Sequence, residues 1–279
     1  MFTRLFAIVT ATAIGSAAIA QEPEPRIVSI GGTVTEIIYA LGQSDLIVAR
    51  DTTSTYPTEA SQLPDVGYMR ALSPEGVLSV DPTLIIAEDG SGPIETIDVL
   101  KEASIDYVTV PTGYTVEAVA EKIMIIGEAL DQSEAAATLA AQVTEDMQAA
   151  AQTAAHDDPK SVLFVLSVQG DRVMAAGQET SADAIISLAG GQNAMGAFDG
   201  YKPVSNEAII EAAPDLILMM QSGGGHAITD EQIIAHPGLG TTPAARAGNI
   251  VRLDGLLLLG FGPRTGDAIQ AVNTALYAE

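Results

Sequence analysis

The chain has 279 residues, a formal net charge of −24 at neutral pH and no cysteine. This charge repels nucleic acid and anionic lipid, so we expect neither as a partner, and the lack of cysteine excludes disulfides, thiolate metal sites and a lipid-anchored cysteine. Because 47% of the residues are hydrophobic and the mean hydropathy is +0.27, the composition also excludes a disordered acidic tail.

Residues 1–20 predict a secretory signal peptide. Arg4 supplies the positive start, residues 5–19 form an apolar stretch, and Ala18-Ile19-Ala20 fits a cleavage site with small residues at its first and third positions. The apolar stretch is too short for a membrane span. We therefore expect cleavage after Ala20, a periplasmic location and a mature chain long enough for two lobes with cores of their own.

The first half after this segment alternates between short apolar runs and amphipathic stretches. Such alternation is typical of a parallel sheet that is covered by helices on both faces, so it predicts an α/β fold. Strands are expected at residues 26–30, 46–49, 83–87 and 107–110, and helices at 33–41 and 115–129.

An alanine-rich stretch near the middle of the chain predicts one long helix. Asp131 and Glu134 have the spacing of a capping box at its start, and Asp157-Asp158-Pro159 ends it. A helix of this length spans about 35 Å at 1.5 Å per residue and would act as a rigid strut. The expected organisation is an N-terminal lobe over 25–131, a connecting helix over 132–156 and a C-terminal lobe over 157–279.

The second half repeats the alternation, with strands expected at 161–168, 215–220 and 250–253 and helices near 180–189 and 266–278. An internal repeat links the halves: residues 73–86 read SPEGVLSVDPTLII and residues 205–218 read SNEAIIEAAPDLIL. In both, Ser-x-Glu begins a short amphipathic helix that proline stops before a buried strand. The repeat predicts two lobes built on one plan.

Motifs of common enzymes are missing. The chain has neither a Gly-x-Ser-x-Gly nucleophile elbow nor a phosphate-binding loop. The stretch LLLLGFGPRTG at 256–266 imitates a dinucleotide-binding fingerprint, but its third glycine comes one place late and only 13 residues follow. No strand–helix–strand unit can be completed there. We therefore expect a protein that is not an enzyme.

The histidines indicate no metal site by themselves. His156, His226 and His236 are scattered and form no pair at helical spacing. We expect His156 to cap the end of the long helix and His236 to lie at a helix boundary. His226 follows three glycines in a loop that is expected to face the cleft between the lobes.

The stretch LPDVGYMRALSPEG at 63–76 holds a tyrosine, Tyr68, on a loop stiffened by proline and glycine. A phenol ionises near neutral pH only beside a strong electrophile or cation. Ferric haem iron is such an electrophile, and tyrosinate is an axial haem ligand in proteins. Arg70, two residues on, could stabilise the phenolate. From these residues alone an ordinary loop tyrosine is an equal alternative.

Four stretches resemble periplasmic haem-binding proteins of bacterial ABC haem importers, within the cobalamin and siderophore (class III) superfamily of substrate-binding proteins. They are RIVSIGGTVTEIIYALG, DTTSTYP, LPDVGYMRALSPEGVLSVDPTLIIA and LDGLLLLGFGPRTGDAI, and the similarity extends over nearly the whole mature chain. The resemblance implies an α/β protein of two Rossmann-like lobes, joined by a single long rigid helix, with the ligand in the interlobe cleft.

The resemblance also implies roles for residues. Tyr68 corresponds to the axial ligand of ferric haem, which is the transported ligand, and Arg70 supports it. Glu75 and Glu207, one per lobe, correspond to glutamates that dock onto the membrane permease. The implied partners are haem and the permease–ATPase complex, and we expect a monomer. A ferric-siderophore or cobalamin carrier on the same fold is the alternative.

The sequence leaves undecided whether the iron has a second axial ligand. His226 and either Met219 or Met220 are candidates for a further axial ligand, and a five-coordinate iron is equally compatible with the sequence. Arg264 resembles the family pattern, but its role as cleft wall or as a contact to the haem propionates is undecided. The number of haems is undecided as well.

Overall fold

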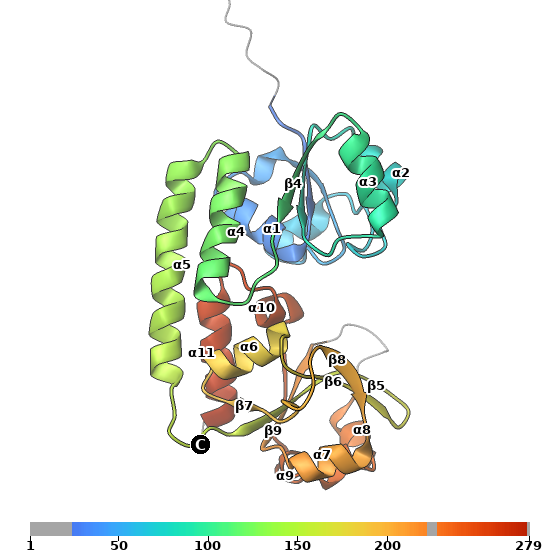
Figure 1. Cartoon of the computed structure of the whole chain (residues 1–279), viewed down its shortest axis with the longest axis vertical. Helices are drawn as coiled ribbons and strands as arrows, with labels where there is room; N and C mark the ends of the chain where they lie inside the picture. Colours follow the sequence, from blue (N-terminus) through green and yellow to red (C-terminus); the bar gives the residue numbers. More distant parts are fainter. Residues whose placement is uncertain (1–23, 222–227, 278–279) are drawn as a thin grey trace, which may run out of the picture.

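A computed structural model of the chain describes residues 24–221 and 228–277 (Figure 1). The predicted signal peptide and His226 lie outside these residues. Two α/β lobes, one above the other in Figure 1, are connected along one side by a long helix, α5 (Ser133–Ala154). This confirms the predicted architecture. In the part of the chain that is described, no helix has the length and apolar character needed to cross a membrane.

The first lobe is built on a four-stranded parallel sheet with the strand order β2-β1-β3-β4. Its strands are β1 (Ile27–Ile30), β2 (Ile47–Arg50), β3 (Leu84–Glu88) and β4 (Asp106–Val110), which confirms the four predicted ones. Alternate side chains along β1 and β3 enter two different cores, because successive residues of a strand face opposite sides. Helices α1 (Gly32–Ala40) and α4 (Val116–Ala129) cover one face, and α2 (Pro74–Leu78) and α3 (Ile94–Glu102) cover the other.

The second lobe has a larger, mixed sheet with the order β10-β9-β5-β6-β8 and a short β7 beside β5. β5, β9 and β10 are parallel as expected, but β6 pairs antiparallel with both β5 and β8, so an entirely parallel sheet was wrong for this lobe. Gly170, at a φ of 60°, closes a hairpin between β5 and β6. Pro203 in β8 cannot donate to a ladder, which suits the edge position that β8 occupies. The bounds are β5 (Ser161–Gln169), β6 (Arg172–Ala176), β7 (Gln192–Asn193), β8 (Tyr201–Val204), β9 (Leu216–Met220) and β10 (Ile250–Leu253).

In the part of the second lobe that the structure describes, α6 (Ser181–Leu188) and α11 (Thr265–Tyr277) cover one face of the sheet. Helix α11 packs on α5, and α10 (Gly255–Leu259) contacts both α6 and α11. The opposite face is covered by α7 (Asn206–Ala212), α8 (Asp230–Ala235) and α9 (Pro243–Ala247).

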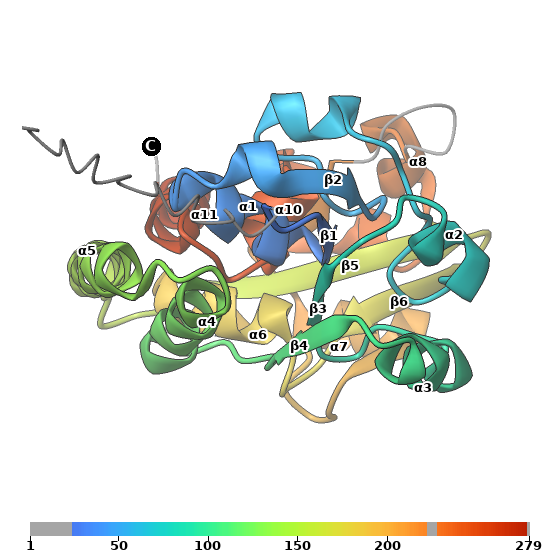
Figure 2. The same cartoon turned by 90° about the horizontal axis from the view of Figure 1, so that it is seen from above.

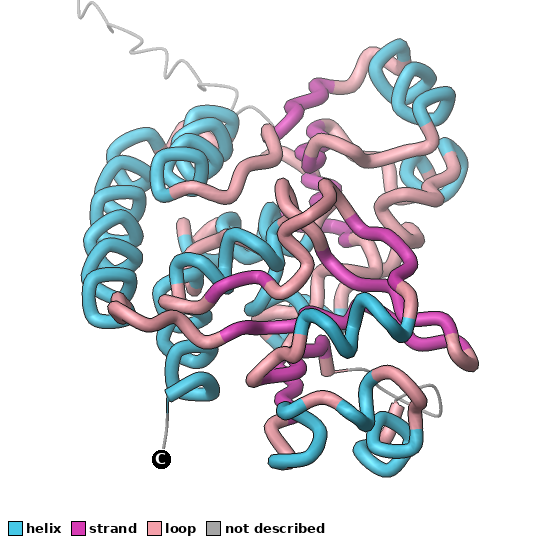
Figure 3. The backbone as a smooth tube through the Cα atoms, turned by 60° about the horizontal axis from the view of Figure 1, so that its bottom comes forward, coloured by secondary structure: helices cyan, strands magenta, loops and turns pink. Residues whose placement is uncertain are grey.

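Helix α5 joins the lobes through packing as well as through the chain. It lies against α4 of the first lobe and α11 of the second, at the left of Figures 1 and 3. Seen from above, α4 and α5 lie at one side of the molecule and α2 and α3 at the other (Figure 2). Small side chains at three- and four-residue spacing let the helices approach closely, and one continuous apolar core results. The buried residues of α5 are Ala136, Ala140, Val143, Met147, Ala150 and Ala154.

The start of α5 differs from the sequence prediction. The helix begins at Ser133 behind Gln132, whose side chain makes no capping bond, so the proposed capping box of Asp131 and Glu134 was wrong. Asp131 takes a left-handed conformation, with a φ of 55°, in the tight turn from α4 to α5. A residue with this backbone cannot also serve as the extended N-cap residue.

The internal repeat is present as a repeated helix–strand unit. Ser73 accepts a bond from the amide of Gly76 at the start of α2, and Ser205 accepts one from the amide of Ala208 at the start of α7. Each short helix leads into a buried strand, β3 or β9. The two lobes therefore share this part of their plan, as the sequence predicted.

Candidate ligand-binding cleft

A cavity of about 580 Å³ lies between the lobes. Most of its lining follows the carboxyl ends of parallel strands, the position where open α/β sheets bind ligands. The first lobe contributes Gly32, Thr33, Thr53, Thr55, Tyr68, Met69, Arg70, Glu88, Asp89, Thr112 and Tyr114, and the second contributes Leu166, Ser181, Tyr201, Met220, Gln221, Asp254, Gly255, Leu256, Leu259 and Gly260.

Tyr68 and Arg70 both line this cavity, so the structure brings together the two residues that the sequence placed on one loop. Tyr68 is 46% exposed, and its phenol therefore contributes little to the core. Burial raises the pKa of Glu88 above its ordinary value, and the positive charges of Lys122 and Arg70 oppose that rise only in part. Arg70 thus lies near a partly buried carboxyl on the wall of the cleft.

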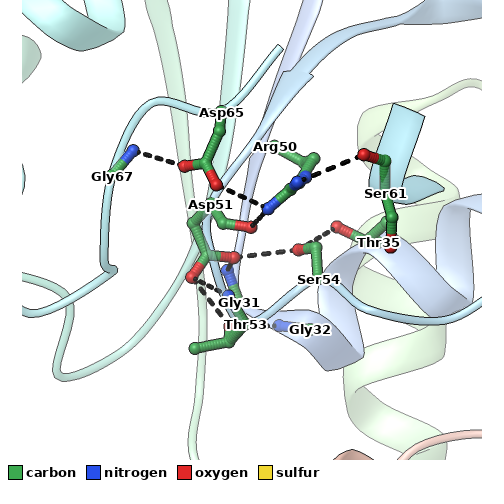
Figure 4. A network of polar contacts seen from close by, with 10 residues as sticks. All are labelled: Gly31, Gly32, Thr35, Arg50, Asp51, Thr53, Ser54, Ser61, Asp65 and Gly67. Atoms are coloured by element: carbon green, nitrogen blue, oxygen red, sulfur yellow. Dashed lines mark hydrogen bonds and ion pairs between the residues drawn. The ribbon is translucent and has the colours of Figure 1, made fainter. Parts of the chain in front are cut away.

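The loop that carries Tyr68 is tied to β2 by an ion pair, which Figure 4 shows, and by backbone hydrogen bonds of Arg50 with Pro64 and Val66. Arg50 Nη1 donates to Asp65 Oδ2 at 2.8 Å, and Asp65 Oδ1 accepts from the amide of Gly67 at 2.7 Å. Gly67 has a φ of 103°, which glycine tolerates best, and its carbonyl accepts from the amide of Thr52 at 3.0 Å. The residue directly before Tyr68 is therefore held from both sides.

Asp51 is the centre of a second group of contacts in Figure 4. It is fully buried, and its Oδ1 accepts from the Gly31 amide and the Ser54 hydroxyl, at 3.0 and 2.8 Å. Its Oδ2 accepts from the amide and hydroxyl of Thr53, at 2.9 and 2.7 Å. Four such donors compensate the buried charge. They fix the stretch DTTST against the turn between β1 and α1, at one wall of the cleft.

The remaining wall is mostly apolar and aromatic. Met69 and Tyr114 come from the first lobe, and Leu166, Tyr201 and Met220 face them from the second. These surfaces suit a flat apolar ligand. Neither Tyr114 nor Tyr201 was expected in the cleft from the sequence, although Tyr114 follows the end of a predicted strand.

Among the described residues that line the cleft, negatively charged side chains outnumber positively charged ones. Glu88, Asp89 and Asp254 supply three carboxyl groups, whereas Arg70 is the single cationic side chain among the described lining residues. An anionic ligand would meet repulsion over much of this surface.

Other predicted site residues have different positions. Met220 lines the cleft, whereas Met219 is 6% exposed and packs into the core of the second lobe, so only Met220 is placed to meet a ligand. Arg264 is bound by Glu36 through two hydrogen bonds of 2.9 and 2.8 Å and lies 3.5 Å from the ring centroid of Tyr56. It is not among the described residues that line the cleft.

The two histidines that are described have structural contacts. His236 ends α8, as expected for a helix-boundary residue, and its Nδ1 accepts from the amides of Gly238 and Leu239. His156 follows the end of α5 and stacks on Tyr277 at 3.5 Å between ring centroids. The described residues contain no cluster of three or more histidines and carboxylates suited to a metal ion.

Glu75 and Glu207 lie in the first turns of α2 and α7 and outside the cleft lining. Negative charge is favourable there because the free amides of a helix start carry partial positive charge. Hydrogen bonds from its own backbone amide and from Ser205 lower the pKa of Glu207. Both groups are therefore available at the surface, one on each lobe.

Two α/β lobes around a cleft, joined by one long helix, define a two-lobed solute-binding protein. Residues 27–256 match the profile of the periplasmic binding protein family, and the chain belongs to this family. Its members and the structures that the chain resembles are solute-binding proteins, not enzymes.

The solved structures and the curated proteins that this chain resembles are named for different ligands. The haem-binding protein RhuT from Roseiflexus sp. RS-1 is 38% identical with a TM-score of 0.87, over 91% of this chain and 98% of that one. BhuT in complex with two haems is 41% identical with a TM-score of 0.85, over 90% and 97%. The vitamin B12-binding protein of Vibrio parahaemolyticus is 25% identical over 92% of this chain and 91% of the relative. The chain is thus a substrate-binding protein of the haem, cobalamin and siderophore type.

Proposed function

We propose that this protein binds ferric haem in the interlobe cleft, with Tyr68 as axial ligand, and delivers it to an ABC importer of the inner membrane. The observation that carries the proposal is the position of Tyr68. Its phenol is exposed in the cleft, on a loop that Asp65 and Thr52 hold in place. A ligand atom held in this way loses little freedom on binding, which favours affinity.

The walls support a planar macrocycle. Met69, Leu166, Met220, Leu256 and Leu259 offer apolar surface around Tyr68, as the faces of a porphyrin require. Arg70 would stabilise the phenolate through its positive charge, since it lines the same cavity. Of the candidates for a second iron ligand that lie in the described residues, Met220 is the one that lines the cleft, so on this proposal it would approach the iron from the second lobe.

Cobalamin and a ferric siderophore are the two alternatives to haem as the ligand of the cleft. Cobalamin is the second candidate because curated relatives are named vitamin B12-binding proteins. A ferric siderophore is disfavoured where it is anionic, since Glu88, Asp89 and Asp254 line the cleft and Arg70 is the one cation among the lining residues that the structure describes. The propionates of haem also carry negative charge, so we expect them to point towards solvent at the mouth of the cleft.

The decisive experiment is a pair of titrations followed by visible absorbance, one with hemin and one with aquocobalamin. The proposal expects a shifted Soret band and tyrosinate-to-iron charge-transfer bands with hemin, and no saturable change with cobalamin. The end point of the hemin titration gives the number of haems per chain.

Tyr68→Phe is the matched variant, because it removes only the oxygen. It should lose the charge-transfer bands and weaken hemin binding by at least about tenfold, or 1.4 kcal/mol. Wild-type spectra and affinity in Tyr68→Phe, or saturable binding of cobalamin alone, would contradict the assignment.

A further inference from the structure

The stretch that imitates a dinucleotide fingerprint belongs to the second lobe and lies in contact with the first. Residues 254–264, here called the crossing segment, follow β10 in sequence. They include Leu256, Leu259 and Gly260 of the cleft lining. The cavity wall that belongs to the second lobe thus depends in part on where this segment lies.

Side chains of the first lobe bind the crossing segment at three residues. Thr33 Oγ1 donates to the carbonyl of Gly260 at 2.6 Å, and Lys122 Nζ donates to the carbonyl of Phe261 at 3.3 Å. Glu36 then accepts both hydrogen bonds from Arg264. These contacts lie within five residues of the segment and come from α1 and α4.

Two of these three partners are buried ionisable groups. Lys122 is 1% exposed and Glu36 is 5% exposed, values that are rare for these residue types unless they are paired. Burial lowers the pKa of Lys122, and Glu88, whose Oε1 lies 4.0 Å from its Nζ, opposes that effect. Burying such groups is costly, so their use at one contact indicates a requirement for a defined geometry there.

The segment itself is held in a conformation that it would not adopt alone. Phe261 has a φ of 51°, which is unfavourable for a bulky residue, and is 1% exposed. Its ring packs on Tyr114 of the cleft, with 5.2 Å between centroids. At Gly32 a Cβ atom would lie 2.6 Å from Leu256 Cδ1, so the missing side chain of Gly32 leaves room for the side chain of Leu256.

We infer that Glu36 and Lys122 are positioning residues of the cleft: they hold the crossing segment on the first lobe and thereby set the separation of the lobes. Helix α5 is one connection between the lobes, and the crossing segment is the second, on the cleft side of the molecule. Two connections on different sides restrict both hinge bending and twisting, which a single helix cannot do. The consequence for haem affinity rests on the proposed function, whereas the lobe separation does not.

The test uses variants that keep side-chain size. Glu36→Gln weakens the pair with Arg264, and Lys122→Met removes the bond to the Phe261 carbonyl. Asp230→Asn is the matched control, because it weakens in the same way the 2.6 Å pair with Arg252, which lies entirely inside the second lobe. Since the chain has no cysteine, Glu95→Cys in α3 and Glu211→Cys in α7 place one spin label on each lobe of every variant.

Pulsed EPR on the ligand-free protein gives the distribution of distances between the labels. We expect Glu36→Gln and Lys122→Met to broaden or shift this distribution and Asp230→Asn to leave it unchanged. Hemin affinity should fall between about threefold and a hundredfold, the range of coupling between contacting groups. Wild-type distributions in both Glu36→Gln and Lys122→Met would overturn the inference.

A role in stability alone predicts a different result. The double variant Glu36→Gln with Arg264→Met replaces the ion pair by a neutral one and should recover stability in urea, because no buried charge is left unpaired. If its distance distribution also returns to that of the wild type, the pair only stabilises the fold and the inference is wrong. A broadened distribution in a stable double variant supports positioning. Failure of the wild type to bind hemin would remove the proposed function and leave the EPR result intact.

Discussion

Arg50 and Asp65 form an ion pair of 2.8 Å that anchors the loop of Tyr68 to the end of β2. Asp65 uses its other oxygen to accept from the amide of Gly67, so one carboxylate joins the strand to the residue before the tyrosine. The side chain of Arg50 is 12% exposed and that of Asp65 is 39% exposed. The pair thus acts at the edge of the core, where geometry matters more than net energy.

We predict that Asp65→Ala weakens hemin binding while the protein stays folded. The loss of both contacts frees the backbone at Gly67, and the phenol must then be ordered when the ligand binds. The free energy of unfolding should fall by about 1–2 kcal/mol, the usual effect of losing a partly buried hydrogen-bonded partner. Urea unfolding and hemin titration measure the two effects. Asp65→Asn can still accept a hydrogen bond from Gly67, so its hemin affinity should lie between those of the wild type and Asp65→Ala. Equal affinities in these three proteins would show that Asp65 does not position Tyr68.

Asp51→Asn should reduce stability more strongly. Both carboxylate oxygens accept hydrogen bonds from donors, and an amide nitrogen in place of either oxygen would face a donor. We expect a loss of about 2–4 kcal/mol, because buried polar groups are left unsatisfied. Asp45→Asn, at an exposed position of the same lobe, is the control and should change urea unfolding little. A stable Asp51→Asn protein would show that the network tolerates a donor.

We predict that the raised pKa of Glu88 makes the stability of the protein depend on pH. Its pKa in the folded protein is raised, mainly by burial, so the folded state binds its proton more tightly than the unfolded state does. This contribution to stability is complete below the ordinary carboxyl pKa and is lost as the pH rises through the raised value. Glu88→Gln removes the titration. The unfolding free energy of the variant minus that of the wild type should therefore increase from pH 4 to pH 8; a constant difference would show that burial does not shift this carboxyl.

Glu75 and Glu207 are predicted to dock the protein onto the permease. The double variant Glu75→Ala with Glu207→Ala should bind hemin normally, since neither residue lines the cleft, but should stimulate the transporter ATPase less in proteoliposomes. Interface charges mainly control association, so the defect should shrink at high salt. Glu95→Ala with Glu211→Ala removes the same charge from exposed positions in α3 and α7 and serves as the control. Full stimulation by the first pair, or equal loss in both pairs, would exclude docking through these glutamates.

Much of the fold was predictable because its signals are local. Buried strands such as 26–30 and 83–87 are short apolar runs, and the long helix is an uninterrupted alanine-rich stretch. The hairpin of β5 and β6 was missed because β6 is a five-residue strand without alternating polarity, and β8 contains a proline. The register of such strands depends on partners distant in sequence.

The residues of the candidate site also fall into those that local sequence motifs reveal and those that only the tertiary structure places. Tyr68, Arg70, Glu75 and Glu207 lie in motifs that can be recognised in the printed sequence. Tyr114 and Tyr201 both reach the cleft only because the end of β4 and the start of β8, which belong to different sheets, lie on opposite walls of it. Sequence alone also left the role of Arg264 open between cleft wall and propionate contact, whereas the structure pairs it with Glu36.

The amino-acid sequence by itself determined the class of fold, the two-lobed plan and the loop that presents Tyr68, since periodicity, proline and glycine act over a few residues. Only the tertiary structure decided which cations meet which carboxylates and backbone carbonyls. Lys122 and Phe261 are 139 residues apart, and Glu36 and Arg264 are 228 apart. Contacts at such separations depend on how the lobes pack around α5 and the crossing segment, and no local pattern encodes that packing.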